Sequence, residues 1–146
     1  MDFNLSQEFI TELPGDPSET NNRRQVKKAC YSFVSPTKPS GPSLIHVSPE
    51  MLDLLEIPRS FSTSDEFLSY FSGQSVYPKS RPFAMAYGGH QFGHWAGQLG
   101  DGRAINIMDI RARDKKWSLQ LKGSGATPYS RTADGLAVLR LSLIHI

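Results

Sequence analysis

The sequence predicts an α+β fold in which a helical and coil N-terminal extension precedes an antiparallel β-hairpin. Before residue 80, apolar residues cluster at helical spacing between proline-containing coils, whereas beyond residue 100 they alternate as strand residues do. The turn-rich stretch 78–82 separates these two parts. We therefore divide the chain into an extension over 1–80, a β-rich unit over 81–140 and a short tail over 141–146.

The composition is that of an ordinary soluble protein. Of the 146 residues, 38% are hydrophobic and 21% are charged, with a formal net charge of +2. This charge is too small to indicate a nucleic-acid or membrane partner, and no apolar run approaches the roughly 20 residues that a membrane span requires. The N-terminus lacks the basic start and apolar block of a secretion signal, so we expect a cytoplasmic protein. The single cysteine, Cys30, can form neither an internal disulfide nor a cysteine-based metal site.

The first half of the extension contains little regular structure. Apolar residues over 3–13 form a loose helical stripe, which Pro14 ends. The basic stretch 23–28 has no aromatic platform beside it, so we interpret it as a solvated surface rather than a nucleic-acid site. Prolines and serines over 30–47 predict extended coil, in which 44–47 could form a short strand.

Two helices follow. Ser48 and Pro49 have the residue types of an N-cap and a first helical position, and Pro58 ends this run. Its buried side is expected to comprise Met51, Leu52, Leu54 and Leu55. Thr63 and Glu66 have capping-box spacing for a second helix that Gly73 closes. The core-facing aromatic and aliphatic residues of the second helix are Phe67, Leu68, Tyr70 and Phe71.

The β-rich unit begins with a buried strand over 83–87, which Gly88 and Gly89 are expected to break. Alternating apolar residues over 103–110 and 117–122 flank a charged turn, a pattern that predicts an antiparallel hairpin. Such a hairpin returns its second strand to the start of the first. Lys122 is therefore expected beside the glycine-rich stretch 100–102.

This arrangement suits a phosphate-bearing ligand. Gly100 and Gly102 can expose backbone amides, Arg103 offers a planar guanidinium and Lys122 a mobile ammonium group. Asp134 could cap a helix beginning near residue 136 or contact the ligand.

Several better-known motifs are absent. The chain has no Walker sequence, and Gly100 and Gly102 lack the third glycine of a dinucleotide-binding fingerprint. His90 and His94 have the spacing of a helical metal pair but no third ligand, so we expect no metal site there. The serines at 124 and 130 are not in a Gly-x-Ser-x-Gly sequence, which argues against a hydrolase nucleophile.

Three segments together resemble one known family. The sequences YGGHQFGHWAGQLGDGR over 87–103, LKGSGATPYSR over 121–131 and Asp-Gly at 134–135 are similar to those of the selenoprotein O family. The resemblance covers about residues 80–140 and is dense, while the helix predicted after Ser48 fits the family less tightly.

The resemblance implies a protein-kinase-like fold, of which 81–140 would be part of the N-terminal lobe. It also implies an adenylyltransferase that uses ATP and Mg²⁺ to transfer AMP to Ser, Thr or Tyr hydroxyls of protein substrates, with ATP reversed relative to ordinary kinases. The ATP-contacting residues of the family correspond here to Gly100, Gly102, Arg103, Lys122, Asp134 and Gly135.

The chain departs from the family pattern at two places. Leu136 replaces a common arginine, a change that we interpret as tolerated variation. After Arg140 the family continues with a helix that carries the glutamate partner of Lys122, whereas this chain reads Leu-Ser-Leu-Ile-His-Ile. These six residues are the translation of CTG TCT CTT ATA CAC ATC, a transposon end used in sequencing libraries, so we expect 141–146 to be an adapter-derived tail.

The resemblance places the catalytic aspartate and the Mg²⁺ ligands in later segments. We therefore expect no catalytic or metal-ligating residue within this chain and no adenylyl transfer by it alone. Two alternatives remain open from the residues: a kinase that transfers the γ-phosphate of ATP, and a non-catalytic nucleotide-binding or interaction module.

Overall fold

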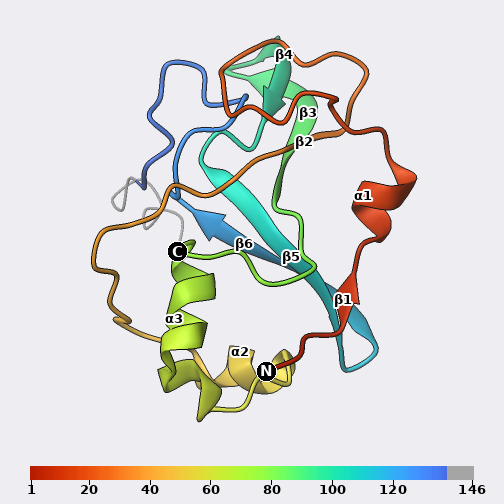
Figure 1. Cartoon of the computed structure of the whole chain (residues 1–146). Helices are drawn as coiled ribbons and strands as arrows, with labels where there is room; N and C mark the ends of the chain where they lie inside the picture. The colour runs from red at the N-terminus through yellow and green to blue at the C-terminus, as the bar shows by residue number, and fades with distance from the viewer. Residues whose placement is uncertain (138–146) are drawn as a thin grey trace.

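An antiparallel sheet of six strands organises the chain, and the helices of residues 49–72 pack together on one of its faces (Figure 1). The computed structural model describes residues 1–137. The strands are β1 (Leu5–Ser6), β2 (Tyr31–Phe33), β3 (Phe83–Gln91), β4 (His94–Gly100), β5 (Ala104–Ala112) and β6 (Lys115–Lys122). The helices are α1 (Glu8–Glu12), α2 (Pro49–Leu54), the 3₁₀ helix η1 (Phe61–Thr63) and α3 (Asp65–Ser72). The central path of the sheet runs β1-β5-β3-β2, while β4 pairs with β3 and β6 with β5.

The predicted hairpin is confirmed as β5 and β6. Its strands are longer than expected, because the turn consists of only two residues, Arg113 and Asp114, both with positive φ. The register pairs Ala104 with Lys122, which places Lys122 at the start of β5, as predicted. A register shift between Asn106 and Met108 interrupts the strict alternation of β5.

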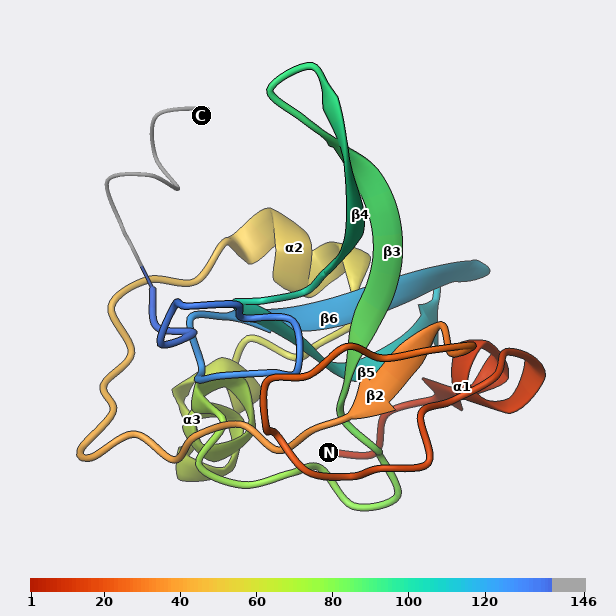
Figure 2. The same ribbon diagram turned by 90° about the horizontal axis from the view of Figure 1, so that it is seen from above.

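The expected break at Gly88 and Gly89 is wrong. β3 runs through both glycines to Gln91 and accommodates them with a bulge before His90. It then turns back into β4, a strand that the sequence reading did not predict. Figure 2 shows this β3–β4 hairpin extending away from the rest of the ribbon.

The N-terminal residues also differ from expectation. The predicted helix over 3–13 is confined to α1, because Leu5 and Ser6 instead pair with Ile110 and Asp109 as β1. The backbone hydrogen bonds of these two residues are therefore made to β5 rather than within a longer helix. The strand predicted over 44–47 does not form. Ile45 is 95% exposed there, so this segment buries little apolar surface that could stabilise a strand.

Both helix starts occur where the sequence places serine. Ser48 caps α2 as predicted, and its Oγ accepts from Met51 N at 3.2 Å. The cap of α3 is Ser64, one residue after the predicted Thr63, which lies in η1. Gly73 ends α3 in a left-handed conformation, as expected.

Only half of the predicted apolar side of α2 is buried. Leu52 and Leu55 lie in the core, whereas Met51 and Leu54 are exposed. Of the aromatic residues in α3, Phe67 is buried and the others pack partly against the same core.

The core has two parts, one on each face of β5. Phe3, Leu52 and Phe67 pack with Ile107, Met108 and Ile110. On the opposite face, Ile105 packs with Val26, Val34, Ala84 and Tyr129. Because both faces of β5 are covered, this strand fixes the position of the loop that precedes it.

Candidate functional site

Arg103 and Lys122 lie at adjoining ends of β5 and β6. Arg103 follows the loop that connects β4 to β5, and its neighbour Ala104 pairs with Lys122. Immediately beyond that pair, Gly123 N donates to Arg103 O at 2.6 Å. The predicted juxtaposition of the two cationic residues is therefore confirmed at the level of the main chain.

Asp134 and Gly135 belong to a third segment beside these two. Ser124 forms a bridge with Leu136, and Gly125 N donates to Gly135 O at 3.3 Å. A side chain at position 135 would place its Cβ only 2.0 Å from Gly125 O, so the segments can approach this closely only with glycine. All six predicted site residues thus lie on three adjoining stretches of main chain.

The helix predicted near residue 136 does not begin there. Leu136 is extended and bridged to Ser124, and residues 138–140 of that helix lie outside the described residues, as does the expected tail over 141–146. The carboxylate of Asp134 accepts from Leu136 N at 2.9 Å, which forms a local turn instead of a helix cap.

Gly100 and Gly102 serve close packing within the chain. A Cβ at position 100 would lie 2.4 Å from the ring of Tyr129, and one at position 102 would lie 2.8 Å from Tyr129 O. We predicted that these glycines let a ligand approach the backbone, but the atoms nearest to both positions belong to Tyr129. Their missing side chains allow the segment around Tyr129 to cover the loop.

The backbone amides of the loop are also largely engaged. Asp101 N donates to Met85 O at 2.9 Å and Gly102 N donates to Gly100 O at 2.8 Å. These two amides are therefore not free to bind an anion, and an anion held at this loop would depend on side-chain donors instead.

Asp101 anchors the loop, a role that sequence reasoning missed. Its buried carboxylate accepts from Met85 N at 3.0 Å and from Asn106 Nδ2 at 3.2 Å, while its carbonyl accepts from Thr127 Oγ1 at 2.7 Å. Burial raises the pKa of this carboxyl, although the hydrogen bonds from Met85 and Asn106 oppose the rise. In the sequence, an aspartate between two glycines indicates only a turn. Its hydrogen-bond partners are distant in the sequence or on another strand, so the sequence does not identify them.

The two cationic residues of the site carry charge that no ion pair compensates. Among residues 1–137, neither Arg103 nor Lys122 forms an ion pair, and the side chain of Lys122 is exposed. The exposed Asp134 contributes the one acidic group among the six predicted site residues.

The other polar residues that the sequence singled out have structural surroundings. Ser130 Oγ donates to Gly102 O at 2.6 Å, and the hydroxyl of Ser124 is buried, so neither is presented as a nucleophile. His90 lies on a strand with its ring edge against Trp95, so its spacing from His94 is not that of a helical pair.

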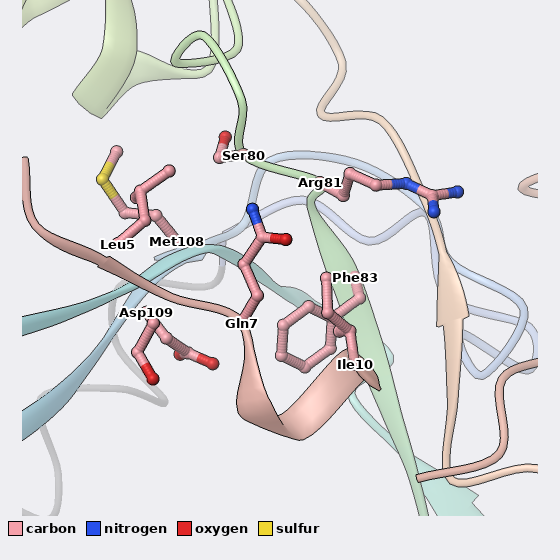
Figure 3. Close-up of a pocket in the computed structure, with 9 residues that line it drawn as sticks. Leu5, Gln7, Ile10, Ser80, Arg81, Phe83, Met108 and Asp109 are labelled. Carbon is pink, nitrogen blue, oxygen red and sulfur yellow. The ribbon is translucent and has the colours of Figure 1, made fainter. Parts of the chain in front are cut away.

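A small, partly open cavity lies elsewhere in the fold. It measures about 20 Å³ and lies between β1, α1 and the strands β3 and β5, lined by Gln7, Phe83 and Asp109 among others (Figure 3). None of the six predicted site residues lines it. In the part of the chain that the structure describes, no group of three or more His, Cys, Asp or Glu side chains is placed to hold a metal ion. Nor does any helix of residues 1–137 have the length and apolar character of a membrane span.

Comparison with known proteins gives a consistent result. Residues 18–145 match the family model described as protein adenylyltransferase SelO. A protein nucleotidyltransferase YdiU of Flavobacterium johnsoniae is 55% identical over 95% of this chain and 27% of its own length. The protein of the same name from Methylobacillus flagellatus is 52% identical over 92% of this chain and 26% of its own length. That from Aromatoleum aromaticum is also 52% identical, over 95% of this chain and 28% of its own length. The chain therefore spans about a quarter of the length of these relatives.

Proposed function

Because the chain belongs to the SelO family of protein adenylyltransferases, we propose that residues 1–137 form one wall of an ATP site in a protein that transfers AMP to protein hydroxyls. The acceptors would be Ser, Thr or Tyr side chains of other proteins. The family is expected to have a protein-kinase-like fold, and the sheet described here would form part of the N-terminal lobe of that fold.

One observation carries this proposal: the cationic residues Arg103 and Lys122 adjoin each other at the ends of β5 and β6 without acidic partners among residues 1–137. ATP carries several negative charges on neighbouring phosphates. A guanidinium and an ammonium group on paired strands can bind two of these oxygens in a defined geometry.

The two residues would act by positioning and charge neutralisation. Attack by a hydroxyl on the α-phosphate requires the attacking and leaving oxygens to lie in line, and charge on the phosphoryl oxygens must be balanced. Arg103 would hold one phosphate through parallel N–H donors, while the exposed Lys122 follows another on its flexible stem. Gly100, Gly102, Asp134 and Gly135 would shape the surface on which the nucleotide rests.

Mg²⁺ would neutralise the phosphate oxygens that these residues leave uncovered. Residues 1–137 offer no cluster of ligands for it, so we place its ligands in the part of the family protein that follows. For the same reason we propose that this chain alone is inactive.

The role of Lys122 can be tested in a chimera. Residues 1–137 would be joined, at the corresponding position, to the remainder of the Flavobacterium johnsoniae relative, which is 55% identical to this chain. Lys122→Ala should weaken ATP binding by about tenfold, because a charge-assisted contact is lost, and should slow AMP transfer.

Lys115→Ala provides a matched control, since Lys115 is an exposed lysine at the opposite end of β6. Both substitutions remove one ammonium group from the same strand. If Lys122→Ala bound ATP and turned over as Lys115→Ala does, the assignment of the site would be wrong.

A further inference from the structure

A second basic site lies beside the β3–β4 hairpin and shares the Tyr129 segment with the proposed ATP wall. It is an open pocket of about 300 Å³, lined by Arg23 and Arg131 together with Leu99, Pro128 and Tyr129. None of the six residues assigned to ATP lines it, and neither does any aspartate or glutamate. At roughly 30 Å³ per water molecule, its volume exceeds that of a single small ion.

The walls of this pocket are held by specific hydrogen bonds. Gln98 of β4 accepts from Val26 N at 3.0 Å and donates to Val26 O at 2.6 Å, so its amide acts as a strand partner for the basic stretch. On the opposite wall, the hydroxyl groups of Tyr129 and Ser32 lie 2.8 Å apart. The pocket is therefore built between segments that the fold fixes in place.

The three arginines that line the pocket differ in whether an acidic residue neutralises their charge. Arg24 pairs with Asp16 and donates to the carbonyls of Thr20, Asn22 and Ser18, so its charge is compensated within the fold. The exposed Arg23 and Arg131 donate only to neutral groups, Ala133 O and Gln91 Oε1, each at 2.8 Å. Among residues 1–137 neither has an acidic partner.

Arg131 also has an unfavourable backbone conformation. Its φ is +54°, in the left-handed region that residues with a side chain seldom adopt. Arg113 at the β5–β6 turn has a similar φ of +49°, so this conformation alone does not mark a binding residue. What distinguishes Arg131 is that it lines the same pocket as Arg23.

We propose that this pocket binds a phosphate-bearing anion, most simply a diphosphate group, between Arg23 and Arg131. Guanidinium groups bind phosphate oxygens through parallel donors, and each arginine retains donors that its single neutral contact does not use. The side-chain amide of Gln25 adds a neutral donor to the lining, while that of Gln98 is held by Val26. This proposal does not depend on the function assigned to the ATP wall.

Inorganic pyrophosphate is a suitable probe for the 146-residue chain. In a two-dimensional NMR titration, the amides of Leu99 and Arg131 should shift with pyrophosphate, and the apparent affinity should fall as ionic strength rises. Arg131→Gln and Arg23→Gln should each weaken this binding by about tenfold. Using both variants keeps the test valid if one of them fails to fold.

Arg113→Gln is the matched control, because Arg113 is an exposed arginine at the β5–β6 turn and does not line the pocket. It should leave pyrophosphate binding unchanged. Tighter binding of ADP than pyrophosphate, with the same dependence on Arg23 and Arg131, would identify the diphosphate of a nucleotide as the ligand. The proposal is overturned if these amides do not shift, or if Arg113→Gln weakens binding as much as Arg131→Gln.

Discussion

Individual residues around the glycine-rich loop have roles that differ from their sequence appearance. Gly100 and Gly102 admit the segment at Tyr129, and Asp101 fastens the loop to β3 and β5. Lys122 is exposed and Arg103 is half-buried, and the exposed Asp134 lies on the adjoining segment. We therefore propose that any binding chemistry here depends on these side chains rather than on the glycine amides.

Asp109 is a polar residue at the small cavity and carries a cost for the fold. Figure 3 shows it on the cavity wall with Leu5 and Met108. Its Oδ1 is buried and has no hydrogen-bond partner within residues 1–137. Burial raises the pKa of this carboxyl, and a hydrogen bond from Ser118 opposes the rise only in part.

A raised pKa makes stability depend on pH in a defined direction. The folded state binds the Asp109 proton more tightly than the unfolded state does, so the folded pKa lies above the model value of 3.8. The contribution of Asp109 to the free energy of unfolding is therefore fully present below the unfolded pKa and is lost as pH rises through the folded pKa. Asp109→Asn, which cannot titrate, should be more stable than the parent chain at neutral pH, and this gain should shrink toward acid pH.

Urea unfolding of both chains over the range from acid to neutral pH measures this difference. The Asn side chain keeps an oxygen that can accept from Ser118, so the shape of the site is preserved. A gain that does not vary with pH would show that the carboxyl is not the source of the effect.

The β3–β4 hairpin shows strain at the scale of an element. Its two-residue turn consists of Phe92 at φ +50° and Gly93 at φ +80°, and the side chain of Phe92 is 98% exposed. Turns with two positive φ values favour Asn-Gly, so phenylalanine is a poor choice for stability. Because the Phe92 ring is exposed, its burial contributes no free energy that would offset the strain of the turn.

Phe92→Asn should raise the free energy of unfolding by about 1 kcal/mol, because asparagine tolerates the left-handed conformation. Phe92→Ala removes the ring equally but does not favour that conformation. Urea denaturation of both variants separates the two effects. Equal changes in Asn and Ala variants would indicate that the ring, and not the turn, sets the stability.

The sequence predicted those elements whose signals are local. The β5–β6 hairpin follows from alternation around a charged turn, and α2 follows from Ser48 and Pro49. β4 was missed because Gly97 and Gly100 are unfavourable in strands, and only pairing with β3 compensates for them. β1 was missed for a similar reason, since its partner Ile110 lies more than a hundred residues away.

The candidate site shows the same division. The proximity of Arg103 and Lys122 could be predicted because it depends only on hairpin geometry. The anchoring by Asp101 and the covering of Gly100 by Tyr129 could not, because both depend on tertiary contacts of residues 127–130.

At the scale of the whole molecule, the two cores lie on either side of β5, and Arg103 and Lys122 lie where β5 begins and β6 ends. The chain spans about a quarter of the length of its relatives. We propose that the remaining groups of the ATP site belong to the part of the family protein that follows. Catalysis is thus a property that we assign to the larger protein.

The most direct test supplies ATP labelled at either the α- or the γ-phosphate to the chimera of residues 1–137 with the Flavobacterium johnsoniae relative. We predict that the α-label enters an acceptor protein, that Lys122→Ala abolishes most of this transfer, and that the 146-residue chain alone transfers none. Transfer of the γ-label would indicate a kinase, and ATP binding without any transfer a non-catalytic module. Either result, or α-label transfer by the isolated chain, would contradict the proposed function.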